Sequence, residues 1–168
     1  HQPSFLDLLS SDPTAYRTPV ELMSYVNQLD PVFAPGTEYQ YSDSDNIVAG
    51  LIAEAASGQS YDQLLRRVVY RPLGLKGTSL PETPRMPRPF VHGYDVGEEG
   101  LEDVSELMNP ALAWASGGMV STQREVGRFF RAYVGGKLFG KKGQRGHRGF
   151  VPGKSSPPGP GKNEAGAG

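Results

Sequence analysis

The sequence predicts an α+β domain that is mostly helical. Three capping signals, each a Ser or Thr followed three residues later by Glu or Gln, precede stretches in which apolar residues recur at helical spacing. Only two short segments, 38–41 and 90–94, are expected to be extended. The chain also holds 22 glycines and 15 prolines among its 168 residues, so we expect long loops between the helices.

The first helix is expected to begin after Thr18. Thr18 can cap it, Pro19 suits the first helical position, and Glu21 completes a capping box. The apolar residues at helical spacing are Leu22, Tyr25, Val26 and Leu29. We expect this helix to end at Asp30, because the residue before a proline avoids the helical region.

Two further helices are predicted in the middle of the chain. The first carries one apolar stripe and should stop at Gly58 in a left-handed cap. Ser60 with Gln63 forms a second capping box and opens the next helix, which Pro72 and Gly74 are expected to break. The apolar positions of these two helices are Ile47, Val48, Leu51, Ile52, Ala55, Leu64, Leu65, Val68 and Val69.

The second half should be richer in loops. Segment 81–89 contains four prolines, segment 90–94 is a candidate strand, and acids dominate 98–106, which we expect at the surface. Residues 116–118, Ser-Gly-Gly, are predicted to form a tight turn.

The last predicted helix opens with a third capping box, Thr122 with Glu125. Its apolar face comprises Val126, Phe129, Phe130 and Tyr133, and we expect the three aromatic residues of this face to be in the core. Gly135-Gly136 should close it.

Composition divides the chain into residues 1–139, which should fold, and a Gly/Pro/Lys-rich tail, 140–168, expected to be a long loop or disordered. From Lys137 onward there are seven lysines and arginines and a single acid, Glu164. A basic tail on an acidic body can indicate a nucleic-acid or membrane partner. We favour a solvated linker instead, and no specific nucleic-acid binding is expected.

Several classes of chemistry have no signal in the sequence. The chain has no cysteine, which excludes disulfides and thiolate sites. The histidines at 1, 92 and 147 are widely spaced, so neither a metal nor a cofactor is expected. No Ser-x-x-Lys, Gly-x-Ser-x-Gly or Walker sequence occurs. No apolar run is long enough for a membrane span, and the first residues, His-Gln-Pro-Ser, show neither a signal pattern nor an initiating Met.

The informative segment is 35–51, Pro-Gly-Thr-Glu-Tyr-Gln-Tyr-Ser-Asp-Ser-Asp-Asn-Ile-Val-Ala-Gly-Leu. It resembles the second motif of the penicillin-recognising serine hydrolases, P-G-x-x-[FY]-x-Y-S-N-x-x-Y-x-x-[AL]-G. Two further segments, 71–78 (Arg-Pro-Leu-Gly-Leu-Lys-Gly-Thr) and 114–122 (Trp-Ala-Ser-Gly-Gly-Met-Val-Ser-Thr), are similar to later family stretches in the same order. The branch includes class C β-lactamases, D-alanyl-D-alanine carboxypeptidases and family VIII esterases.

The resemblance implies roles for four residues. Tyr41 matches the tyrosine that relays a proton between the serine nucleophile and the leaving group. Asp43 stands where the family has Asn, so it keeps an acceptor for a catalytic lysine and loses the donor to the substrate carbonyl, which favours an esterase-like specificity; it could instead merely cap the following helix. Ser116 and Trp114 would line the substrate cleft, although core packing explains Trp114 equally well.

The resemblance also implies what the 168 residues lack. Family members carry Ser-x-x-Lys before this segment and a His-Thr-Gly or Lys-Thr-Gly strand after it; His147-Arg148-Gly149 imitates the latter, and we interpret it as loop. The chain would thus be an internal fragment holding the helical subdomain of the β-lactamase/transpeptidase-like fold, with most of the central sheet missing.

The implied function is a serine hydrolase that forms an acyl-enzyme with D-Ala-D-Ala-type peptides, β-lactams or small esters, the fragment itself being inactive. The alternative is a non-catalytic binding module that reuses the helical subdomain. The implied partner is a small-molecule or peptide substrate, and the implied location is extracytoplasmic. The sequence leaves the oligomeric state open.

Overall fold

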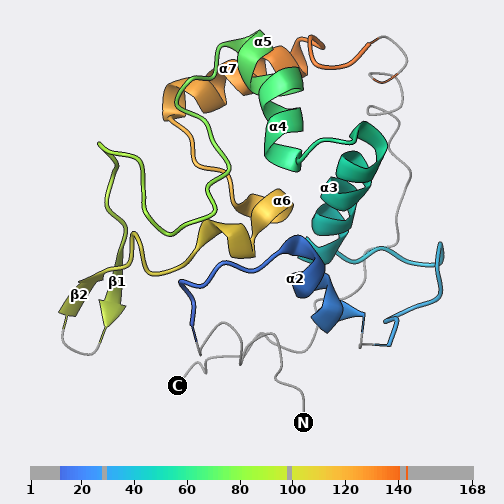
Figure 1. The fold of residues 1–168 in the computed structure, drawn as a ribbon, viewed down its shortest axis with the longest axis horizontal. Helices are drawn as coiled ribbons and strands as arrows, with labels where there is room; N and C mark the ends of the chain where they lie inside the picture. The colour runs from blue at the N-terminus through green and yellow to red at the C-terminus, as the bar shows by residue number, and fades with distance from the viewer. Residues whose placement is uncertain (1–11, 28–29, 98–99, 141–142, 144–168) are drawn as a thin grey trace, which may run out of the picture.

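The computed structural model describes residues 12–27, 30–97, 100–140 and 143 (Figure 1). Helices dominate, and the sheet found in these residues has two strands. The fold class predicted from the sequence, α+β and mostly helical, agrees with this. In chain order the elements are α2 (Pro19–Val26), α3 (Asp43–Ser57), α4 (Tyr61–Leu65), a π-helical turn η1 (Arg66–Tyr70), α5 (Arg71–Leu73), β1 (Tyr94–Gly97), β2 (Gly100–Asp103), a 3-10 turn η2 (Pro110–Leu112), α6 (Trp114–Gly117) and α7 (Gln123–Val134).

Helix α2 begins as predicted. The Thr18 hydroxyl accepts from the Glu21 amide, and the Glu21 carboxylate accepts from the Thr18 amide, 2.7 Å away. The helix ends at Val26 with Asn27 as its C-cap, earlier than the predicted end at Asp30, because Asn is a poor helix former whose side chain competes for backbone partners.

Helix α3 ends at Gly58, which takes the predicted left-handed conformation with φ 66°. Ser60 then caps α4 by accepting from the Gln63 amide. The prediction that Pro72 breaks the following helix is wrong. The chain passes through the π turn and continues to Leu73, since the widened turn tolerates a residue without an amide hydrogen, and only Gly74, at φ 65°, ends it.

The core forms where α3 meets α2 and η2. Leu22, Ile47 and Leu112 are buried together, and Trp114 packs against them. Helix α6 approaches α3 closely at Gly50: a Cβ there would lie 2.7 Å from the Trp114 ring and 2.8 Å from the Ala115 methyl. Glycine is therefore required at the crossing.

A buried asparagine ties three loops together. Asn109 is 2% exposed. Its amide nitrogen donates to the carbonyls of Thr14 and Glu82, and its side-chain oxygen accepts from the Ala111 amide. The Asn109 side chain thereby satisfies backbone groups of segments that are distant in the sequence, groups that would otherwise be buried without a partner.

The extended part differs from its prediction. The hairpin pairs Tyr94 with Asp103 and Gly97 with Gly100, so the strands lie after the predicted segment 90–94. Both strands are largely exposed and carry no apolar alternation that would reveal them. The Ser-Gly-Gly segment is likewise not a free turn, because it continues the short helix α6 to Gly117.

Helix α7 begins at the predicted place, but its capping box is incomplete. Thr122 accepts from the Glu125 amide, whereas the Glu125 carboxylate accepts from the Gly77 amide and the Thr78 hydroxyl, 2.5 Å away. This carboxylate links α7 to the loop after α5.

The apolar face of α7 lies along an open groove of about 660 Å³. Phe130 is 55% exposed, so its predicted place in the core is wrong, while Phe129 and Tyr133 are half-buried. Side chains of α4 and η1, including Tyr61 and Val68, form the opposite wall. The helical face has its predicted residues, but within the described part of the chain nothing covers it fully.

Nothing in the described residues tests the tail. Most of 140–168, including His147, lies outside them. No helix in the described ranges is both long and apolar enough to cross a membrane.

Candidate active site

The site is built at the N-terminus of α3. Ser42 is the N-cap and Asp43 the first helical residue, so Tyr41 lies in the preceding loop, 66% exposed. The Tyr41 hydroxyl donates to the Asp43 carboxylate across 2.7 Å. The Tyr41 phenol is thus accessible at the surface.

Helix α6 brings the third group to the same place. The Ser116 hydroxyl donates to the carboxylate oxygen of Asp43 that Tyr41 also contacts. Ser116 and Asp43 are separated by 73 positions in the chain. They meet because helices α3 and α6 cross closely at Gly50.

A pocket of about 460 Å³ lies beside this cluster. Asp43 and Ser116 form part of its wall together with Met108, and apolar side chains from the core complete it, among them Leu22 and Ile47. It has the form expected of a small-molecule site, mostly apolar with a few converging polar groups. Among the described residues, no group of His, Asp or Glu side chains could hold a metal ion.

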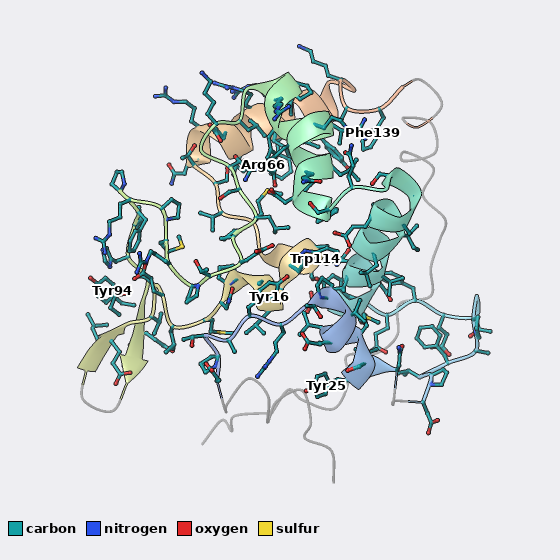
Figure 2. All side chains as sticks on the ribbon, viewed as in Figure 1. Tyr16, Tyr25, Arg66, Tyr94, Trp114 and Phe139 are labelled. Atoms are coloured by element: carbon teal, nitrogen blue, oxygen red, sulfur yellow. The ribbon has the colours of Figure 1, made fainter. Side chains whose placement is uncertain are left out.

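Trp114 lies apart from this pocket wall. Figure 2 shows it at the centre of the molecule, where α6 meets α3. Its ring packs 5.0 Å from the Tyr61 ring and against the core, and its backbone has φ 37°, a conformation that a bulky residue seldom adopts. Packing against Gly50 and Tyr61 holds this strained conformation, and a substrate-lining role for Trp114 stays a prediction.

Asn46 joins the site without having been predicted. It lies one helical turn after Asp43, and its side-chain nitrogen donates to the Ser116 hydroxyl at 3.5 Å. Residues three apart share a helix face, and Asn46 occupies the position where the family pattern has a tyrosine. That spacing was the signal available in the sequence.

The hydrogen bonds between Tyr41, Asp43 and Ser116 determine which of these side chains is charged. Donation from Ser116, and then from Tyr41, lowers the pKa of the Asp43 carboxyl from its ordinary value. The Asp43 carboxylate in turn raises the pKa of the Tyr41 phenol above 10, because ionising the phenol would remove the hydrogen bond and place two anions together. At neutral pH the cluster therefore holds one carboxylate and two neutral hydroxyls.

The helical fold and the Tyr-Ser-Asp segment that leads into α3 agree with the family resemblance found in the sequence. The chain belongs to the β-lactamase family, whose family model matches residues 2–168.

Two comparisons at the level of sequence and fold specify the relationship. The D-alanyl-D-alanine-carboxypeptidase/endopeptidase AmpH of Escherichia coli (strain K12) is 32% identical over 114 residues, which are 66% of this chain and 27% of AmpH. The crystal structure of a D-stereospecific amidohydrolase from Streptomyces sp. is similar with a TM-score of 0.77 and 29% identity, covering 85% of this chain and 43% of that one.

A third relative is a D-amino acid amidase from Ochrobactrum anthropi SV3, solved in complex with D-phenylalanine. It has a TM-score of 0.68 and 26% identity over 76% of this chain and 39% of its own. The present chain thus spans about a quarter of AmpH and less than half of the two amide hydrolases.

Proposed function

We propose that this chain is the second-motif portion of a serine acyl hydrolase that cleaves amide bonds next to D-amino acids. The observation that carries the proposal is the meeting of Tyr41, Asp43 and Ser116 beside one pocket. AmpH is named for D-alanyl-D-alanine, the Ochrobactrum amidase for D-amino acids, and the Streptomyces amidohydrolase as D-stereospecific. These names favour an amide over the ester expected from Asp43 alone.

In the proposed reaction the nucleophile is a serine on polypeptide outside these 168 residues. Tyr41 accepts the proton of that serine as the serine oxygen attacks the carbonyl, and returns it to the leaving amine. A phenol can do this near neutral pH only if nearby cations stabilise the phenolate. In the described chain the opposite holds, since Asp43 raises the pKa of Tyr41.

Asp43 provides a negative group to which the required cation could bind. It is an anion with no cation on the pocket wall described here, so an incoming lysine ammonium would find an acceptor in Asp43 and would weaken its hold on Tyr41. An ionised carboxylate offers no donor to a substrate carbonyl. We therefore expect weak recognition of β-lactams, with Asn46 as the nearest side-chain amide.

The open groove along α7 supports the proposal that the central sheet of the family fold is absent from this chain. Exposed apolar surfaces of this size mark places where another element docks. Phe130 and Val126, both more than two-fifths exposed there, would be covered in the complete fold. On this proposal the 168 residues alone have no hydrolase activity.

The test compares the complete product of the gene with the 168-residue chain. The complete protein should hydrolyse D-phenylalanine amide faster than the L-enantiomer, and Tyr41→Phe should lower kcat by about 10²–10⁴-fold, the usual contribution of one acid–base group. Tyr39→Phe, which removes the phenol hydroxyl of another exposed tyrosine two residues earlier, is the matched control and should retain most of kcat. Equal rates for Tyr41→Phe and the parent protein would refute the proposal.

The chain alone should give no turnover of that amide, of a chromogenic cephalosporin or of p-nitrophenyl acetate, and no covalent mass increase. The alternative, a non-catalytic binding module, predicts that the complete gene product binds D-phenylalanine but turns over none of the three substrates. As for its family, we propose an extracytoplasmic location, tested by fractionation of the producing cells.

A further inference from the structure

A second pocket lies at the opposite end of the molecule from α2, around the π turn η1 and helix α5 (Figure 1). Its volume is about 390 Å³, and it shares no lining residue with the pocket beside Asp43. The lining residues are Arg66, Tyr70, Arg71, Gly74, Leu75, Lys76 and Thr78.

The π turn creates this arrangement. The Arg71 amide bonds to the Arg66 carbonyl, five residues back, and the chain then turns at Gly74, whose φ of 65° suits only glycine or a few polar residues. The turn places Arg66, Arg71 and Lys76 around one pocket. Such π turns are frequent at functional sites.

The positive charge of this pocket exceeds its negative charge. Arg66 pairs with Asp62, Nε to Oδ2 at 2.6 Å. Within the described residues, no ion pair forms at Arg71 or Lys76, and both are exposed. The Glu125 carboxylate, beside the same loop, bonds to the Gly77 amide and the Thr78 hydroxyl. Arg71 and Lys76 thus have no ion-pair partner among the residues that the structure describes.

A buried hydroxyl provides independent evidence of a missing partner. Tyr70 is 3% exposed, and in the described part of the chain its hydroxyl has no hydrogen-bond partner. Burial raises the pKa of this phenol to about 12, so the hydroxyl keeps its proton and can donate. Buried polar groups are rarely left unpaired, so this hydroxyl is available to donate to acceptor atoms of a ligand in the pocket that Tyr70 lines. Tyr70 also lines the apolar groove, and the Oδ1 atom of Asp62 is a second buried atom without a partner in the described residues.

We propose that this pocket binds a phosphate group, held by Arg71, Lys76 and the free guanidinium nitrogens of Arg66, with Tyr70 as an additional donor. The two unpaired cations match a dianion, and guanidinium groups bond to the oxygens of a tetrahedral phosphate in pairs. Figure 2 shows Arg66 beside α4. The pocket has room for the phosphate and a small attached group.

The test uses the complete gene product and inorganic phosphate, titrated by calorimetry at low ionic strength with chloride as the reference anion. The parent protein should bind phosphate, and Arg71→Gln with Lys76→Gln should weaken binding at least tenfold. Arg67→Gln is the matched control, because the Arg67 Nε donates to Gln59 instead, and it should bind like the parent.

Tyr70→Phe provides a second variant, since it removes only the hydroxyl. It should weaken phosphate binding several-fold without lowering the melting temperature of the unliganded protein. The proposal is overturned if the parent prefers phosphate no more than chloride, if the double variant binds like the parent, or if Arg67→Gln loses as much affinity.

A vesicle assay separates the sources of the phosphate. Co-sedimentation with phosphatidylglycerol vesicles, but not with phosphatidylcholine vesicles, that is lost in the double variant would identify a lipid headgroup. Calorimetric binding without co-sedimentation would identify a soluble phosphate. Binding of acetate as tightly as phosphate would overturn the phosphate assignment in favour of a carboxylate.

Discussion

The hydroxyl of Tyr41 donates a 2.7 Å hydrogen bond to the carboxylate of Asp43, so the proton of the tyrosine is held by the residue that departs from the family pattern. An Asn in that position could accept a hydrogen bond from the phenol but would not repel a phenolate. The departure at position 43 therefore acts on the acidity of Tyr41 as well as on substrate contact.

The first prediction is that Asp43→Asn lowers the pKa of the Tyr41 phenol, because the hydrogen bond to the carboxylate is the largest cause of its rise. The measurement is an NMR titration of ring-labelled tyrosine, with the Tyr41 signal assigned through Tyr41→Phe. Asp45→Asn, an acid in the same helical turn, is the control and should leave the titration in place. An unchanged pKa in Asp43→Asn would contradict the assigned cause.

The second prediction concerns the helix crossing. Gly50→Ala should lower the free energy of unfolding by about 1–3 kcal/mol, because the added methyl overlaps the Trp114 ring and the Ala115 methyl. Gly127→Ala in α7 meets only the end of the Arg131 side chain, at 3.6 Å. It should raise stability by about 0.5–1 kcal/mol. Denaturant unfolding of both variants checks the contrast, and equal effects would show that the crossing is not tight.

The third prediction concerns the buried asparagine. Asn109→Ala leaves the Thr14 and Glu82 carbonyls without donors and should cost about 1–3 kcal/mol of stability for each that stays unsatisfied. Asn109→Asp, nearly the same shape, should be at least as harmful because it faces both carbonyls with an anion. Thermal unfolding measures both. Parent-like stability in either variant would mean that water replaces the side chain at no cost.

The fourth prediction concerns pH and the hairpin. Hydrogen bonds from Ser105, and then from His92, lower the pKa of Asp103 from 3.8 to about 2. A lowered folded-state pKa gives stability that is present above the unfolded value and lost as pH falls through the folded one. Pairing of β1 with β2 should therefore weaken between about pH 4 and pH 2, which amide exchange at Asp95 and Glu102, a directly paired couple of the hairpin, can follow. Asp103→Asn should abolish this dependence, and a midpoint unchanged by that substitution would assign it to another group.

Much of the helical fold could be predicted from the sequence because its signals are local. The Thr18–Glu21 box and the Gly58 cap depend on residues within a few positions of one another. The Glu125 carboxylate could not be placed in this way, since its partners Gly77 and Thr78 lie 48 and 47 residues away. Local spacing shows that such a residue can cap, but not that a distant loop competes for it.

The residues of the candidate site also fall into those that local sequence predicts and those that it does not. Tyr41 and Asp43 are two residues apart, and the motif predicts both. Ser116 was connected to them only through the family resemblance, because nothing local indicates a contact across 73 residues. The π turn, which positions Arg66 and Arg71, has no sequence signature, and Pro72 pointed instead to a helix break.

The exposed aromatic side chains along α7 have a practical consequence for anyone who handles the purified polypeptide. Phe130 is 55% and Phe139 40% exposed, and both border the groove of about 660 Å³. In a solution of the pure polypeptide, such an apolar surface is most readily buried by contact with a second copy of the chain. Light scattering at increasing concentration should therefore report a growing apparent mass, and mild detergent should reverse it.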